Sequence, residues 1–158
     1  MFKSYLLTFL VSMVPLVELR GAIPFAMAGV NPPLPLVHAY IISILGNMAP
    51  VPFIYLFARK VLHWGKDKAL IGGPFRYLLS RGERVGKKWT QKNGGSLYLA
   101  LLLFVGIPLP GTGAWTGTLA ASLLDLDFKK STRAVMGGVL LAGVIVGALS
   151  AAGIQILK

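Results

Sequence analysis

Residues 15–24 read PLVELRGAIP and residues 108–117 read PLPGTGAWTG, and each motif interrupts an apolar stretch of the chain. Proline removes a backbone hydrogen-bond donor and glycine weakens a helix, so neither stretch is expected to continue as one straight transmembrane helix. Membrane proteins tolerate such breaks where protein encloses the exposed backbone. Paired breaks in corresponding parts of two halves point to a substrate site.

The composition predicts an integral membrane protein. Of 158 residues, 55% are hydrophobic and only 13% are charged, whereas soluble domains carry about 25% charged residues. This length suits a single membrane domain over residues 1–158, with no separate soluble domain. There is no cysteine, and we find no Walker loop, metal-ligand cluster or nucleophile–base pair. The chain is therefore expected not to be an enzyme and to need no metal or cofactor.

The net charge of +11 is concentrated in one segment. Between Arg59 and Lys92 lie ten Lys and Arg residues and two acids. A basic segment beside apolar spans is the positive-inside signal, so membrane lipids with anionic headgroups are the expected partners and nucleic acid is not. Residues 75–89 suit either an amphipathic helix on the cytoplasmic membrane face or a solvated basic loop.

The chain contains two short and two long apolar runs. They are Tyr5–Val17, Leu36–Ala58, Leu97–Val105 and Ala134–Leu157. As a helix the first reaches only about 20 Å and the third less, whereas the hydrocarbon core of a bilayer is about 30 Å thick. The second and fourth are long enough to span. Gly46-Asn47 and Pro50-Val51-Pro52 predict a kink in the second.

The order of these runs repeats one unit twice. Repeat one covers residues 4–59, the basic segment residues 60–95 and repeat two residues 96–158. The halves superpose when Gly21 is aligned with Gly113, 92 residues further on, although their identity is low.

Charge favours one of two topologies. If both broken segments crossed the membrane, the cations of residues 129–133 would lie opposite the basic segment. If both are re-entrant hairpins, the two basic groups share the cytoplasmic side, which obeys the positive-inside rule. We therefore expect an all-α, multi-pass protein of the cell membrane. It would contain two inverted repeats, each a re-entrant helical hairpin plus a transmembrane helix, with the hairpin tips meeting near the midplane.

Glu18 and Arg20 are the charged residues of the first broken segment. Glu18 is the only acid in the first 66 residues, and a charge at bilayer depth costs about 3 kcal/mol or more. In the functional interpretation, Glu18 exchanges a proton and Arg20 holds an anionic group. In the structural interpretation, the two form a buried ion pair that fixes the hairpin tip. Intramembrane ionisable residues favour the former.

The second motif offers backbone amides and the hydroxyls of Thr112 and Thr116, which can bind an anion, or it forms a tight turn that permits close packing. Trp115 suits stacking on a ligand or a packing role. Asn47 suits a bond to the opened backbone or a cavity wall, and packing is the favoured role. The expected substrate-binding set is Glu18, Arg20, Gly21, Asn47, Pro108, Pro110, Gly111, Thr112, Gly113, Trp115 and Thr116.

Residues 18–24, ELRGAIP, together with residues 108–117, resemble the small multidrug export protein family, which is distantly related to the DedA/VTT-domain membrane proteins. The resemblance covers nearly the whole chain. DedA-like relatives imply two opposed re-entrant hairpins and, in some members, movement of polyprenyl-phosphate or other lipids by membrane-embedded acids and arginines. Glu18 and Arg20 match such a site. The second half departs from it, because Thr112 stands opposite Arg20 and its motif contains no acid.

We therefore expect a secondary membrane transporter or lipid translocase for a small amphipathic, anionic, polyprenyl-phosphate-like substrate, with protons as a possible coupling ion. One alternative is proton-coupled efflux of hydrophobic cations. Another is a non-transporting membrane factor whose basic segment recruits lipid or protein.

Small residues recur every four positions, at 113, 117 and 121 and at 143, 147 and 151, and permit close helix approach. We also expect a homodimer.

Overall fold

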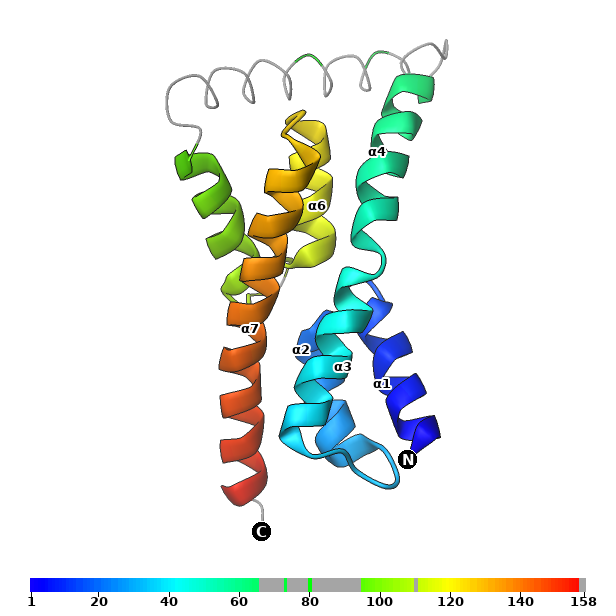
Figure 1. Ribbon diagram of the computed structural model, residues 1–158, viewed down its shortest axis with the longest axis vertical. Helices are drawn as coiled ribbons and strands as arrows, with labels where there is room; N and C mark the ends of the chain where they lie inside the picture. Colours follow the sequence, from blue (N-terminus) through cyan, green and yellow to red (C-terminus); the bar gives the residue numbers. More distant parts are fainter. Residues whose placement is uncertain (66–72, 74–79, 81–94, 110, 157–158) are drawn as a thin grey trace.

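The computed structural model describes residues 1–65, 73, 80, 95–109 and 111–156, which form helices without any strand among them. The chain begins with a helical hairpin. Helix α1 (Phe2–Met13) runs from one end of the molecule to mid-height (Figure 1). After a short turn, α2 (Glu18–Pro24) and the π-helical turn η1 (Phe25–Gly29) return to the same end.

Two helices then follow one another along the whole length of the molecule. They are α3 (Leu36–Met48) and α4 (Val51–Gly65), and Figure 1 shows them stacked end to end. The helix is interrupted at residues 49–50, which confirms the kink predicted from Pro50 and Pro52. These prolines lack the N–H groups that a continuous helix would use there.

A second hairpin occupies the opposite end. The helix Gly95–Gly106 descends to mid-height, the chain then turns, and α6 (Ala114–Leu123) returns to the same end (Figure 1). Helix α7 (Phe128–Ile156) then runs the full length back. The turns of the two hairpins thus lie side by side at mid-height, and hydrogen bonds made by the side chains of Glu18, Arg20 and Trp115 join them.

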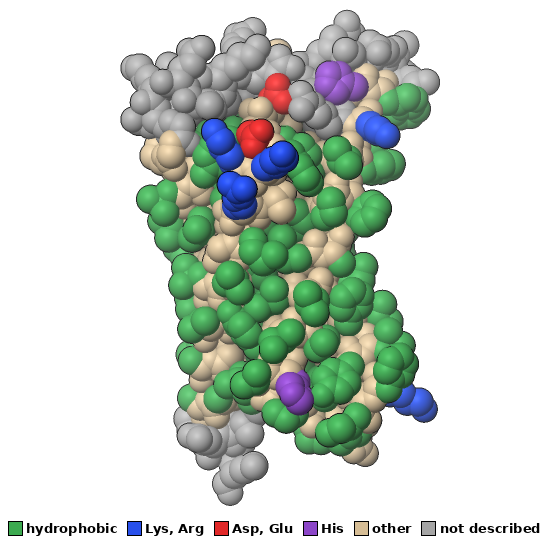
Figure 2. Space-filling view, in the orientation of Figure 1, with side chains coloured by type: hydrophobic (Ala, Val, Ile, Leu, Met, Phe, Trp, Pro, Cys, Tyr) green, Lys and Arg blue, Asp and Glu red, His purple; other side chains and the backbone are tan. Residues whose placement is uncertain are grey.

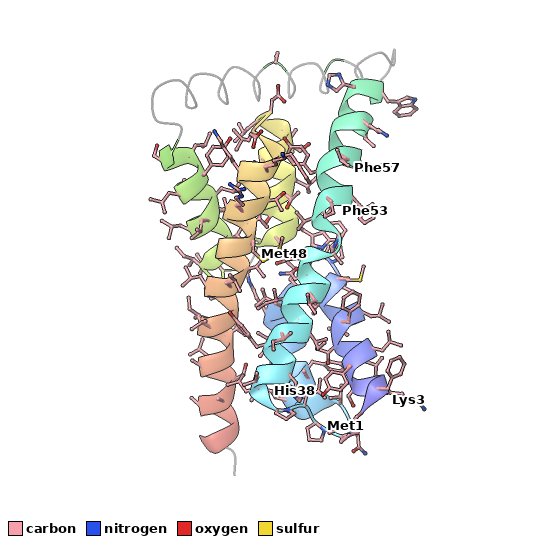
Figure 3. The ribbon with its side chains drawn as sticks, viewed as in Figure 1. Met1, Lys3, His38, Met48, Phe53 and Phe57 are labelled. Atoms are coloured by element: carbon pink, nitrogen blue, oxygen red, sulfur yellow. The ribbon has the colours of Figure 1, made fainter. Side chains whose placement is uncertain are left out.

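Length, composition and surface agree with a membrane protein. Leu36–Ala58 and Phe128–Gly153 are long and apolar enough to span a bilayer, and only 39% and 44% of their most apolar windows are buried within the molecule. A core helix of a soluble protein would be mostly buried. Figure 2 shows hydrophobic side chains over the middle and cations gathered beside the start of α7. Lys3 and His38 lie at the other end (Figure 3), and Phe53 and Phe57 of α4 are exposed.

The interruption expected over residues 15–24 is wrong for residues 18–24, because these residues are helical. The interruption lies at residues 14–17, where Pro15 follows the end of α1. Pro24 does not end the helix, because the chain widens into the π-helical turn η1 after it. In the second motif the described residues 108–109 and 111–113 are non-helical, and residues 114–117 are helical. The first residues of α2 and α6 are 96 positions apart, so the alignment of Gly21 with Gly113 does not match the helix starts.

The core forms where α2 meets the long helices. Helix α2 packs against α1, α3 and α7, and α6 packs against α4 and α7. Leu19 and Ile23 are buried on α2, as are Val105 before the second turn and Val135 and Val139 on α7. This packing holds both hairpin turns against the full-length helices. The predicted amphipathic helix or basic loop over residues 75–89 lies outside the described residues.

Gly46 permits the close approach of α3 to α1. A Cβ atom there would lie 3.0 Å from Ser12 Cβ and 3.1 Å from the backbone carbon of Phe9. Because that backbone belongs to a packed helix, Gly46→Ala is expected to lower the free energy of unfolding by about 1–3 kcal/mol. Thermal unfolding of the purified protein in detergent measures this. Gly153→Ala is the control, because nothing lies within 4 Å there, and a similar loss in both variants would refute the packing argument.

Candidate functional site at the hairpin turns

The turn of the first hairpin places the Glu18 carboxylate against the second hairpin. Leu16 and Glu18 adopt left-handed backbone angles, with φ of 74° and 49°. Non-glycine residues pay roughly 1–2 kcal/mol for this conformation, and such strain gathers at sites where surrounding contacts hold it in place. Here it lets the chain reverse within four residues and start α2 with Glu18 facing inward.

The Glu18 carboxylate binds the N-terminus of α6. Its Oε2 accepts the N–H of Ala114 at 3.2 Å, and its Oε1 accepts the N–H of Trp115 at 3.0 Å. The first N–H groups of a helix have no partner within it, and its N-terminus carries partial positive charge. Glu18 is only 5% exposed, so these amides replace water as its hydrogen-bond donors.

Gly113 makes room for this contact. Its backbone φ of 142° is rarely adopted by residues other than glycine, and a Cβ atom there would lie 2.6 Å from Glu18 Cδ. A glycine immediately before α6 is therefore needed both for the backbone angle and for the space that the carboxylate occupies.

The Arg20 guanidinium binds the turn that precedes α6. Its Nη1 donates to the carbonyl of Leu109, and its Nη2 donates to Thr112 Oγ1 at 2.7 Å and, more weakly, to the carbonyl of Ile107 at 3.5 Å. These carbonyls lie just beyond the C-terminus of the helix Gly95–Gly106, where a positive charge is favourable. The charges of Glu18 and Arg20 are thus compensated by opposite helix ends of the second hairpin.

Trp115 adds a third link between the hairpins. Its indole Nε1 donates to the carbonyl of Met13, the last residue of α1, at 3.1 Å. Each hairpin therefore satisfies backbone groups of the other that an interrupted helix leaves unpaired. Neither hairpin turn is self-sufficient in its backbone hydrogen bonds.

A cavity of about 400 Å³ lies at this junction. Its lining includes seven of the predicted residues: Glu18, Arg20, Pro108, Gly111, Thr112, Trp115 and Thr116. The lining also contains Pro15, Leu16, Leu109 and Leu119, which the sequence analysis did not single out. The first three lie inside or beside the two motifs, so the motifs themselves were the signal. Nothing in the sequence marked Leu119.

Three predicted residues lie elsewhere, and one is not described. Gly21 is in α2 beside Val17, and Gly113 contacts Glu18 without lining the cavity. Asn47 is completely buried on α3, and neither polar atom of its side-chain amide has a hydrogen-bond partner in the part of the chain that the structure describes. It therefore neither faces the cavity nor bonds to the opened backbone. Pro110 is outside the described residues.

An all-helical fold with two membrane-length helices and a charged cavity halfway along them defines a small helical membrane protein. The chain belongs to the family described as "Putative small multi-drug export protein", which matches residues 18–145. This confirms the resemblance seen in the sequence. The description names an export protein, not an enzyme. No curated protein and no solved structure matches the chain. No cluster of His, Cys, Asp and Glu suited to a metal occurs among the described residues.

Proposed function

We propose that this protein exports an amphipathic, anionic small molecule or lipid through the cavity at the hairpin junction. The observation that carries this proposal is the cavity itself, which is lined by Glu18 and Arg20 where the two hairpin turns meet, in a chain that also has two membrane-length helices. In this proposal the two hairpins are re-entrant, enter from opposite membrane faces and form an inverted repeat. Alternating exposure of their shared cavity would then move the substrate across.

The apolar side chains around the cavity support a substrate with a hydrocarbon part. Leu16 is 92% exposed and Leu109 is 56% exposed, and both line the cavity. At mid-height of a membrane protein, exposed side chains face lipid tails. A molecule dissolved in the bilayer could therefore enter sideways, with its tail among these leucines and its polar group beside Arg20.

The accessible charge in the cavity supports an anionic polar group. The Glu18 carboxylate is nearly inaccessible, and both of its oxygens already accept backbone N–H groups. Arg20 is only half-buried, and its three recorded bonds leave donors of the guanidinium unused. A phosphate or carboxylate could bind these donors without breaking the bonds to the turn.

Proton-coupled efflux of hydrophobic cations is a second candidate, favoured by the family description. In that mechanism a cation would have to pair with Glu18. The carboxylate would then have to leave the amides of Ala114 and Trp115, so drug binding would open the junction between the hairpins. Substrate charge therefore distinguishes the two candidates.

We further propose that the end bearing Lys129, Lys130 and Arg133 is cytoplasmic, in agreement with the positive-inside rule. A homodimer gains no support from the glycines expected to mediate it. Gly117, Gly143 and Gly147 contact Val105, Tyr40 and Leu36 of the same chain. Dimerisation would have to use other surfaces.

Filling the cavity tests the proposal with little disturbance of the fold. Leu119 lines the cavity from α6 and is exposed, so Leu119→Trp is expected to lower transport at least 10-fold while the protein stays folded. Leu149→Trp is the matched control, because Leu149 is an exposed leucine on α7 that does not line this cavity. It should transport like the wild type.

The measurement uses purified protein in liposomes, with and without a pH gradient. A fluorescent polyprenyl-phosphate analogue and a lipophilic cation serve as alternative substrates. Movement of the anion that Leu119→Trp abolishes supports the proposed function. Movement of the cation alone favours drug efflux. If folded Leu119→Trp protein transports as fast as the Leu149→Trp control, the cavity is not the route.

A further inference from the structure

A second hollow lies at the basic end of the molecule, away from the hairpin junction. It is a shallow groove of about 410 Å³ between the helix Gly95–Gly106 and the start of α7. Its lining residues are Tyr98, Leu99, Leu102, Lys130, Arg133 and Ala134. In Figure 2 the cations beside the start of α7 stand at the border between the hydrophobic middle of the molecule and its charged end.

The groove carries two positive charges with no recorded compensation. Lys130 and Arg133 are exposed, and neither forms an ion pair with an acid in the described residues. The nearby Asp127 carboxylate accepts the backbone N–H of Lys130 at 2.8 Å and so caps α7. The Lys130 ammonium lies 5.9 Å from the centroid of the Tyr98 ring, which forms one side of the groove.

The rest of the groove is apolar. Leu99 is 56% exposed, and the half-buried Leu102 and the buried Ala134 also line the groove. Both helices run from the basic end toward the middle of the molecule (Figure 1). The apolar side of the groove formed by Leu99 and Leu102 therefore extends toward the hydrophobic middle. A ligand that fits this groove therefore has an anionic head at the membrane boundary and a hydrocarbon chain directed inward.

We propose that this groove binds an anionic phospholipid of the surrounding leaflet. Its phosphate would lie between Lys130 and Arg133, and one acyl chain would run along Leu99 and Leu102. Basic pockets between membrane helices at the boundary favour such headgroups, and the apolar wall favours a lipid over free phosphate. This inference concerns a bound lipid, not the transported substrate, and it does not depend on the proposed function.

The test measures lipid binding to the full chain in detergent by native mass spectrometry. Phosphatidylglycerol and phosphatidylcholine with identical acyl chains are titrated in parallel. The double variant Lys130→Gln/Arg133→Gln removes both groove cations. The matched control, Lys3→Gln/Lys60→Gln, removes the same net charge from exposed lysines outside the groove. Leu99→Gln tests the apolar wall.

We expect wild type to bind one phosphatidylglycerol at least 10-fold more tightly than phosphatidylcholine. The groove variant should bind it roughly 30-fold more weakly, and the control within about 3-fold of wild type. Leu99→Gln should weaken binding several-fold. Equal losses in groove and control variants would mean non-specific attraction and overturn the proposal. So would displacement of the lipid by millimolar inorganic phosphate, or unchanged binding in the groove variant.

Discussion

Gly113→Ala is expected to disrupt the hairpin junction and to cost at least about 3 kcal/mol of folding free energy. The new Cβ would lie 2.6 Å from Glu18 Cδ and 2.7 Å from its Oε1. The carboxyl group cannot move aside without losing its bonds to Ala114 and Trp115, which are then left unpaired in an apolar environment. The backbone angle of Gly113 adds strain of its own.

Gly111→Ala provides the matched control for this substitution. Gly111 is in the same turn and also has a positive φ, 82°, but nothing lies within 4 Å of its Cβ position. Its replacement should therefore cost only the backbone strain, about 1 kcal/mol. Thermal unfolding in detergent compares the two variants. Equal midpoints would show that the Glu18 contact contributes little to stability.

Arg20→Gln is expected to have the second-largest effect, a loss of roughly 3 kcal/mol. It removes the donors to Leu109 and Ile107, whose carbonyls lie in the second turn. It also removes the positive charge that lies with Glu18 in the cavity lining, so that only the amides of α6 compensate the carboxylate. Anion transport should be lost together with stability.

Two further substitutions separate geometry from charge. Arg20→Lys keeps the positive charge, but a single ammonium cannot reproduce the forked contacts with the turn, so most of the stability loss should persist. Arg133→Gln removes an exposed arginine for which no bond is recorded and should leave the unfolding midpoint unchanged. If Arg20→Lys is as stable as wild type, charge alone explains the role of Arg20.

These expectations change how a transport assay on Glu18 and Arg20 must be interpreted. Both side chains stabilise the junction, so loss of transport in either variant does not by itself show a role in binding. A glutamine at position 18 can accept from one amide only and presents its own N–H groups to the other. Stability and transport therefore have to be measured on the same preparations, and the cavity-filling variant is the cleaner functional test.

The sequence predicted those features correctly that depend on local composition or on the free-energy cost of burying a charge. The short apolar runs predicted helices that stop halfway, and α1 and the helix Gly95–Gly106 do so. The cost of charge at bilayer depth singled out Glu18 and Arg20, and both line the cavity. The paired prolines predicted the interruption between α3 and α4.

Sequence reasoning failed where the outcome depends on contacts between distant segments. Pro24 was expected to lie in a broken stretch, but α2 is buried against three helices and the chain widens into η1 instead of ending there. In the structural interpretation Glu18 and Arg20 formed an ion pair with each other, whereas the hydrogen bonds of both side chains go to the second hairpin and their charges interact only at longer range. Asn47, for which a packing role was favoured, is fully buried on α3 and does not line the cavity.

From its sequence alone, this chain is a membrane protein with two interrupted apolar segments and charges at bilayer depth, because hydropathy, length and proline chemistry act locally. The sequence also led us to expect that the two interruptions meet, but only the tertiary structure decided which side chains and backbone groups pair across them. The unpaired backbone groups at a helix end need hydrogen-bond partners in an apolar medium. Here those partners lie about 90 residues away along the sequence. Tertiary packing brings them together and leaves the cavity between them.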